Sequence, residues 1–232
     1  MPKILINEKI FSYTIKKKQG VSLGLKLISP KSFQISCHRF VPEFLIIKFI
    51  KDHSDWIIKN AVKIYPKKSI LSLKELIILD KIYKIIILKT VRDSVIISEN
   101  EQTIYINSFR LTEAHLRSIL ETRLRRLALI LIKSELRKLQ IQHDFKFGNI
   151  TVRNQKSRFG SCSSVGNLNF NWQIILFPED KFRHILLHEL NHLKIKNHKA
   201  EFWQQLSVYD PNSKSNNLWL KKEGTKYFLI KP

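Results

Sequence analysis

The sequence contains little cysteine and has no long apolar run. Its two cysteines, Cys37 and Cys162, are too few for a disulfide framework and lack the paired CxxC spacing of a zinc ribbon, so we expect free thiols. The longest apolar runs, such as residues 127–132, fall short of the ~18 residues that a membrane span needs. The start of the chain also lacks the regions of a signal peptide. We therefore expect a cytoplasmic protein with no transmembrane segment.

Acidic residues are scarce as well, because 19 Asp and Glu stand against 41 Lys and Arg, which leaves a net charge of +22. The excess is spread over both halves of the chain, so the sequence has no basic tail. A lysine- and isoleucine-rich chain with only 6 glycines is also what a biased genome produces. A field of this size nevertheless attracts nucleic acid, nucleotides or acidic membrane surfaces. The charge therefore permits nucleic acid as a partner without identifying it.

Apolar periodicity divides the chain into strands and helices. Alternation predicts antiparallel strands near the start, and helical spacing after Pro42 predicts one helix over residues 41–65. Thr112 is placed to cap a long helix that continues to about Leu139. No internal repeat stands out. The expected strands are residues 21–29, 32–37, 81–90, 94–100, 103–108, 149–154 and 166–177.

The stretch HELNHLKIKNH at residues 188–198 carries the clearest chemistry. His188 and His192 are four residues apart, so on a helix both imidazoles project from one face and can bind one zinc ion. Glu189 then lies beside the open position of the metal. The apolar residues around them predict a mostly buried helix, opened by Pro178 and Asp180, with its histidines at the edge of a cleft.

A third metal ligand is expected at His198, which follows His192 by six residues as in the metzincin pattern. That pattern places a glycine where this chain has Ile195, so we expect the turn at Asn197, which tolerates left-handed geometry. The methionine turn of metzincins is absent, because Met1 is the only methionine.

Two alternatives compete with His198. His184 lies eight residues before His192, or ~12 Å along a helix axis, which is too far for one ion. We therefore expect His184 in a supporting or surface contact. The other alternative is a carboxylate downstream of the motif, and the chain offers Glu201, Asp210 and Glu223.

The segments KSRFGSCSSVGNLNFNWQIILFP and HELNHLKIKNHKAEFW resemble the YgjP-like metallopeptidase domain, a family of predicted metal-dependent hydrolases related to SprT-like proteins. The likeness is dense over residues 150–223 and weaker upstream. It implies that His188, His192 and His198 bind zinc and that Glu189 is catalytic. The chain departs from the family pattern at three places, which are Phe159 in place of the usual Trp, and Arg183 and His184 in place of a common acidic–aromatic pair.

These residues predict an α+β fold. We expect a β-rich N-terminal region over residues 1–110 with one helix, and a zincin-like region over residues 111–232 with a small β-sheet and the HExxH helix, unless the two form one continuous domain. Glu189 would take a proton from the water on zinc. Arg158 either stabilises the developing oxyanion or only holds its loop. Cys162 is expected as a packed loop thiol.

Three functions fit this sequence. The first is a zinc metallopeptidase with a peptide substrate. The second is a metal-dependent nucleotide phosphoanhydride hydrolase (a pyrophosphatase), although the chain has no GxxxxGK[ST] loop. The third is a nucleic-acid-associated binding protein with a structural zinc. The intact Glu189 favours an enzyme, because a structural zinc site needs no base.

Overall fold

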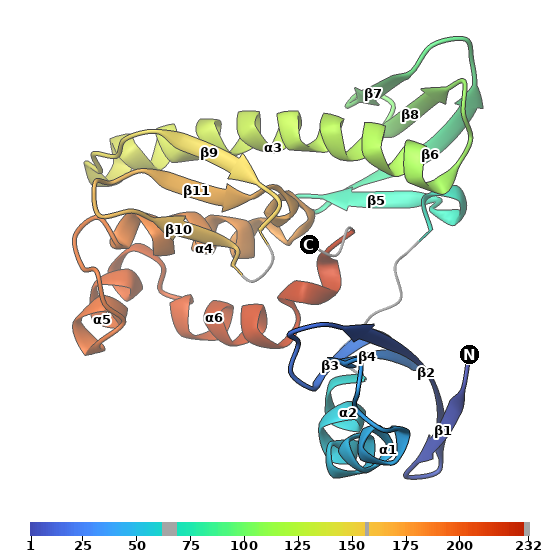
Figure 1. Cartoon of the computed structure of the whole chain (residues 1–232). Helices are drawn as coiled ribbons and strands as arrows, with labels where there is room; N and C mark the ends of the chain where they lie inside the picture. Colours follow the sequence, from blue (N-terminus) through green and yellow to red (C-terminus); the bar gives the residue numbers. More distant parts are fainter. Residues whose placement is uncertain (62–68, 156–157, 230–232) are drawn as a thin grey trace. The chain divides into compact units, whose positions relative to one another are not determined.

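The computed structural model describes residues 1–61, 69–155 and 158–229. The chain forms two compact units, Met1–Lys67 and Lys68–Pro232, here called the N-terminal and the C-terminal unit (Figure 1). Each unit has its own hydrophobic core. This boundary falls earlier than the expected division after residue 110, because the strands before that residue share a core with the long helix that follows them. Assignment of residues 111–232 as the metallohydrolase region stays a prediction.

A four-stranded sheet forms one layer of the N-terminal unit. Its strands are β1 (Lys3–Ile6), β2 (Lys9–Lys18), β3 (Gly24–Ser29) and β4 (Ser32–His38), in the order β1-β2-β4-β3. The antiparallel pairing expected near the start is confirmed for β1–β2 and β3–β4, whereas the central pair β2–β4 is parallel. Alternate side chains of these strands, including Phe11, Tyr13, Phe33 and Ile35, form the inner face of the core.

Two helices cover this sheet where the sequence predicts one. Helix α1 (Glu43–Asp52) ends at His53, and α2 (Ser54–Ala61) begins directly after it. The backbone of His53 leaves the helical range, with φ −105° and ψ 14°, and this ends the first helix. The ring Nδ1 of His53 lies 2.9 Å from the Phe49 carbonyl. The predicted continuation over residues 62–65 lies outside the described residues.

The C-terminal unit begins with a second sheet of the same arrangement. Its strands are β5 (Glu75–Ile78), β6 (Lys81–Lys89), β7 (Ser94–Ser98) and β8 (Thr103–Ser108), in the order β5-β6-β8-β7. The outer pairs are again antiparallel and the central pair is parallel. The first hairpin of each sheet, β1–β2 and β5–β6, turns through two residues with positive φ, as a tight two-residue hairpin requires. These residues are Asn7–Glu8 and Leu79–Asp80. The structure thus repeats an arrangement that the sequence does not reveal.

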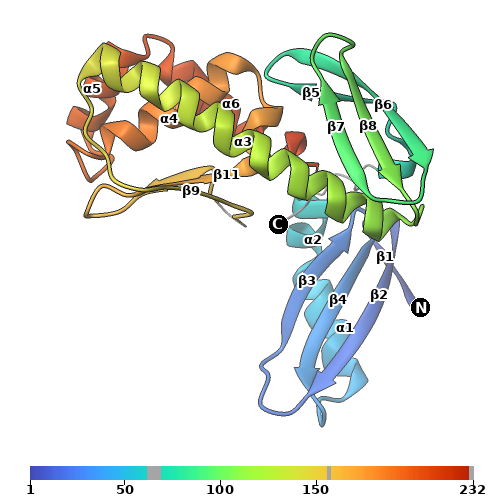
Figure 2. The same cartoon turned by 90° about the horizontal axis from the view of Figure 1, so that it is seen from above.

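Helix α3 (Glu113–His143) runs across the C-terminal unit and contacts both of its sheets (Figure 2). It is longer than predicted by about one turn. Thr112 is the residue before the first turn, as predicted, but its side chain makes no capping hydrogen bond to the helix. The buried side of the helix is apolar and consists of Leu116, Leu120, Leu124, Ala128, Ile132, Leu136 and Leu139. None of the helices in the described ranges is both long and apolar enough to cross a membrane.

A small sheet and three helices complete the C-terminal unit. Strands β9 (Ile150–Arg153), β10 (Gly160–Cys162) and β11 (Leu168–Asn171) pair in the order β10-β11-β9. The strand predicted to run to residue 177 ends at Asn171, whose side chain accepts a bond from the Gln173 N–H and opens the 3-10 turn η2 (Trp172–Leu176). The helices are α4 (Glu179–Asn191), α5 (Ala200–Tyr209) and α6 (Ser213–Lys222), and the turn η3 (Gly224–Tyr227) follows.

Glu113 joins helix α3 to the short turn η1 (Ile70–Ser72). Its carboxylate accepts bonds from the Ser69 hydroxyl at 2.7 Å and from the Ile70 N–H at 2.9 Å. Burial alone would raise the pKa of Glu113, but these bonds and the one from Arg117 outweigh burial and lower it from 4.5 to about 2.

Glu113→Gln should therefore lower the free energy of unfolding at pH 7 by about 1 kcal/mol, the scale of a partly exposed charge-assisted hydrogen bond. Because the folded pKa is depressed, the difference should be complete above pH 4.5 and shrink as the pH falls toward 2. Urea unfolding at pH 7 and pH 3.5 measures it. Glu121→Gln, on the same helix, is the matched control and should change little. A difference that does not depend on pH would contradict the role of the carboxylate.

Candidate metal centre

Helix α4 is a core helix that carries polar residues on one side. Pro178 precedes it, and Glu179 and Asp180 lie in its first turn, where acidic side chains favour a helix start. Its apolar residues are buried on several faces, as the sequence predicts, and comprise Phe182, Ile185, Leu186, Leu187 and Leu190. The helix contacts α3, α5, α6 and β10, so its position is fixed from all sides.

The imidazoles of His188, His192 and His198 converge at the end of this helix. The Nε2 of His198 lies 3.0 Å from the Nε2 of His188 and 3.2 Å from the Nε2 of His192. Among the described residues, these three form the one group of His, Cys, Asp or Glu side chains that could hold a metal ion. His184 and Cys162 do not belong to it.

The tautomer of His192 follows from its second ring nitrogen. The Nδ1 of His192 lies 3.0 Å from the Ile195 carbonyl, which can only accept, so Nδ1 carries the proton. Nε2 therefore directs a lone pair toward the other two imidazoles. Burial, aided by the neighbouring imidazoles, lowers the pKa of His188 to about 3, so this ring is also neutral near pH 7. Neutral imidazole is the form that binds metals.

The nitrogen spacing fits a metal ion. Zinc binds imidazole nitrogen at about 2.0–2.1 Å with tetrahedral angles, which places two such nitrogens about 3.3–3.4 Å apart. The observed separations of 3.0 and 3.2 Å are close to this value. A single Nε2 proton cannot satisfy both contacts of His198, whereas a cation attracts all three lone pairs.

The loop after α4 returns the chain so that His198 faces the helix. It turns without the left-handed residue expected at Asn197, whose φ is not among the positive values of the described chain. The Asn197 side chain instead accepts the Lys199 N–H at 3.1 Å. The indole of Trp203 on α5 donates to the His198 carbonyl at 3.1 Å. These side-chain bonds supply what the metzincin glycine supplies by backbone freedom.

His184 is buried and lies outside the imidazole group, so of the two contacts expected for it the surface contact is wrong and the supporting contact stays a prediction. Its side chain is 1% exposed, and its Nδ1 lies 2.6 Å from a carboxylate oxygen of Asp210. The Nε2 of His184 is buried without a partner among the described residues. Arg183, which departs from the family pattern together with His184, donates to Glu135 and Gln142 on α3. Both residues therefore tie α4 to its neighbours.

Glu189 is 6% exposed and lies against strand β10. A Cβ at Gly160 would stand 2.7 Å from the Cγ of Glu189, so only glycine permits this approach. Burial raises the pKa of Glu189 to about 8, and the positive charge of Arg158 acts in the opposite direction. A cation held by the three imidazoles would also favour the carboxylate form.

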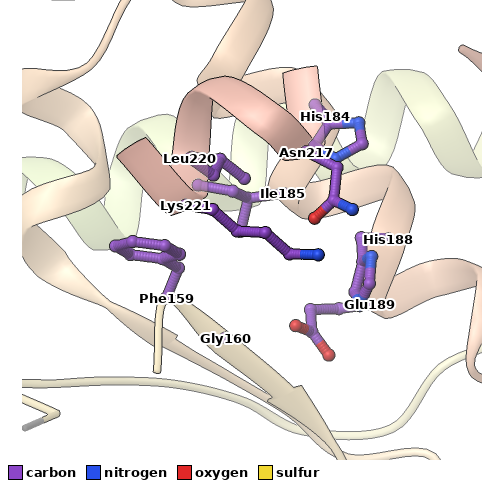
Figure 3. Close-up of a pocket in the computed structure, with 9 residues that line it drawn as sticks. All are labelled: Phe159, Gly160, His184, Ile185, His188, Glu189, Asn217, Leu220 and Lys221. Atoms are coloured by element: carbon purple, nitrogen blue, oxygen red, sulfur yellow. The ribbon is translucent and has the colours of Figure 1, made fainter. Parts of the chain in front are cut away.

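Two pockets meet at the polar end of α4, and Gly160, His188 and Glu189 line both. The first is polar and adds Arg158, Ser161, Cys162, His192, Lys196 and His198. The second is more apolar and adds Phe159, His184, Ile185, Asn217, Leu220 and Lys221 (Figure 3). Asn217 and Lys221 lie within the family likeness over residues 150–223, and Lys221 is part of its closing stretch WLKKEG, but sequence reasoning assigned neither residue to the site.

The site and its scaffold define a metal-dependent hydrolase of the metallopeptidase class. Residues 21–223 match the YgjP-like metallopeptidase domain, so the chain belongs to this family and the expected resemblance is confirmed. No curated protein gives a significant match.

Two solved structures are similar to part of the chain. One is the metallopeptidase zymogen jannalysin of Methanocaldococcus jannaschii, with 27% identity and a TM-score of 0.36 over 40% of this chain and 95% of that one. The other is the metallopeptidase zymogen abylysin of Pyrococcus abyssi, with 20% identity and a TM-score of 0.35 over 39% of this chain and 93% of that one.

Gly160→Ala should destabilise the C-terminal unit by about 1–3 kcal/mol, the usual cost of forcing an extra methyl into a packed site. Its Cβ would overlap Glu189, which has little room to move. Urea unfolding followed by tryptophan fluorescence measures the effect. Gly24→Ala is the control, because nothing lies within 4 Å of its Cβ. Equal stability of both variants would show that Glu189 is not confined by β10.

Proposed function

We propose that this chain is a zinc-dependent metallopeptidase in which His188, His192 and His198 bind the metal and Glu189 is the general base. The observation that carries the proposal is the convergence of three imidazole Nε2 atoms beside a buried carboxyl group. Membership of the metallopeptidase family supports the class of reaction. The loop bond that fixes the His192 tautomer supports the ligand assignment.

Zinc is the metal that suits these ligands best. Three nitrogen donors and an open fourth position are typical of catalytic zinc, whereas magnesium and calcium prefer oxygen ligands. Two of the three alternative carboxylates have other partners, since Asp210 bonds to His184 and Glu223 pairs with Lys226. Among the described residues, none of the three, including Glu201, belongs to the group that could hold a metal ion. The alternatives of a carboxylate third ligand therefore lose support.

The residues around the site divide the work of hydrolysis. When bound, zinc supplies positive charge that acidifies a water molecule and polarises the scissile carbonyl. Glu189 takes the proton of the attacking water and delivers it to the leaving amine. Arg158 lines the same pocket and offers donors to the oxyanion that develops. Gly160 lets strand β10 come close enough to hold Glu189 in place.

A second candidate function is hydrolysis of nucleotide phosphoanhydrides. The observation in its favour is that Arg158 and Lys196 line the polar pocket beside the imidazoles and could receive phosphate. Screening the zinc-loaded protein against peptides and nucleoside triphosphates, with Glu189→Gln as control, separates the two reactions. Nucleic-acid binding with a structural zinc stays a prediction that rests on the net charge.

The metal assignment predicts about one zinc per chain in purified protein. His188→Ala, His192→Ala and His198→Ala should each lose most of it, because three ligands are the minimum for a stable catalytic zinc site. Inductively coupled plasma mass spectrometry after dialysis measures the zinc content.

His184→Ala is the control for this experiment. It should lower the melting temperature, because it removes a buried bond to Asp210, yet keep the zinc. Zinc retained in His198→Ala and lost in His184→Ala would identify a different third ligand. Full zinc in all three ligand variants would refute the metal site.

The base assignment predicts that Glu189→Gln keeps zinc content and melting temperature near the parent values, because no ligand is lost. Hydrolysis should fall by ~100-fold or more, as expected for the loss of a general base. Steady-state rates on the best substrate of the screen provide the measurement. If the variant remained fully active with zinc bound, the base would have to be another group.

A further inference from the structure

The pocket beneath helix α6 is a second recognition feature of the candidate site. It shares Gly160, His188 and Glu189 with the polar pocket, and α6 contributes Asn217, Leu220 and Lys221 to its lining. Its volume of about 210 Å³ is below the roughly 300–1,000 Å³ of pockets for drug-sized ligands, so it suits a single side chain. Apolar walls come from Phe159, Ile185 and Leu220.

Polar groups enter this pocket from one helix. Lys221 extends along it with its ammonium group toward the end formed by His188 and Glu189, and the carboxamide of Asn217 points into the same space (Figure 3). Within the described ranges Lys221 has no carboxylate in ion-pair distance, unlike Lys226 and Lys181. Its charge is therefore available to a ligand.

Cations predominate among the described residues that line the two pockets. Lys221 lines the apolar pocket, and Arg158 and Lys196 line the polar one, whereas the single acidic residue among these described lining residues is Glu189. On our assignment Glu189 acts on water and not on substrate charge. Apolar walls strengthen a charge interaction, because they lower the local dielectric. A ligand that spans both pockets thus meets cations on each side of the reacting bond.

We propose that the pocket beneath α6 selects an acidic residue of a peptide substrate next to the scissile bond. Lys221 and Asn217 receive the carboxylate, and the methylene groups of the acidic side chain pack on Phe159, Ile185 and Leu220. Basic side chains are excluded by repulsion, which discriminates more sharply than attraction alone. This inference rests on the proposed peptidase function and names the class of its substrate.

The test uses the zinc-loaded full chain and a peptide mixture made by chymotryptic digestion of a whole-cell lysate, which keeps acidic and basic residues inside the peptides. Cleavage sites are mapped by mass spectrometry. Asp and Glu should be enriched about fivefold to tenfold at one position beside the cleaved bond, which corresponds to about 1–1.4 kcal/mol. The enrichment should weaken at 1 M salt, where screening is strong.

Lys221→Met should abolish the acidic preference, and Lys221→Glu should replace it by a preference for Lys or Arg. Lys222→Glu is the matched control, since it makes the same charge change one residue away without lining the pocket and should keep the preference and the rate of the parent. Asn217→Leu should weaken the preference without inverting it.

The outcomes separate this inference from the proposed function. Peptide cleavage without enrichment of acidic residues, or with a preference that survives Lys221→Glu, overturns the pocket assignment and leaves the peptidase intact. An equal loss in Lys222→Glu shows a general field and also overturns it. Hydrolysis of nucleoside triphosphates without any peptide cleavage overturns both the pocket assignment and the proposed peptidase function.

Discussion

The bond from the Nδ1 of His192 to the Ile195 carbonyl is the interaction on which the candidate site depends. It fixes the side of the ring that carries the proton and holds the first residues after α4 in a turn. Both effects are needed, because His198 must come back over a helix that has already ended. The Asn197 and Trp203 bonds then fix the rest of the loop. The return of this loop is held by side-chain hydrogen bonds, at a place where the metzincin pattern has a glycine.

Burial sets the electrostatic character of the site. Helix α4 is surrounded by apolar contacts, and this environment opposes charge on both His188 and Glu189. Burial therefore favours the neutral form of His188, which is the form that binds a metal. It also favours the protonated form of Glu189 beside it, because Arg158 offsets the effect of burial only in part. Rigid support comes from polar contacts one turn earlier, where Arg183 and His184 bond to α3 and to Asp210. The cations lie at the rim, where water still reaches them and a substrate can replace it.

The parts of the fold and of the candidate site that could be predicted are those set by the spacing of residues close together in the sequence. The placement of His188 and Glu189 on one helix follows from four-residue periodicity and apolar flanks, and those features survive in the structure. The break at His53 was missed because a histidine with local backbone bonds has no distinctive sequence pattern. Strand β10 was missed because three residues cannot show alternation, although they confine Glu189. Lys221 stands in the stretch WLKKEG of the family likeness, but its place beside His188 and Glu189 depends on the packing of α6 on α4, which spacing within the sequence does not give.

The repeated sheet has a consequence for how the chain reaches its fold. Each copy consists of two local hairpins joined by one parallel pairing, so its early contacts are close in sequence. The two sheets differ in the side chains on their outer faces. Three neighbouring strands of the N-terminal sheet align the polar residues Thr14, Gln34 and Lys26, whereas the C-terminal sheet aligns Ile86, Tyr105 and Ile96. The N-terminal unit closes within Met1–Lys67, whereas Arg117 of the C-terminal unit bonds to the carbonyl of Leu229. During synthesis the first unit can thus fold while the helices of the metal centre are still being made.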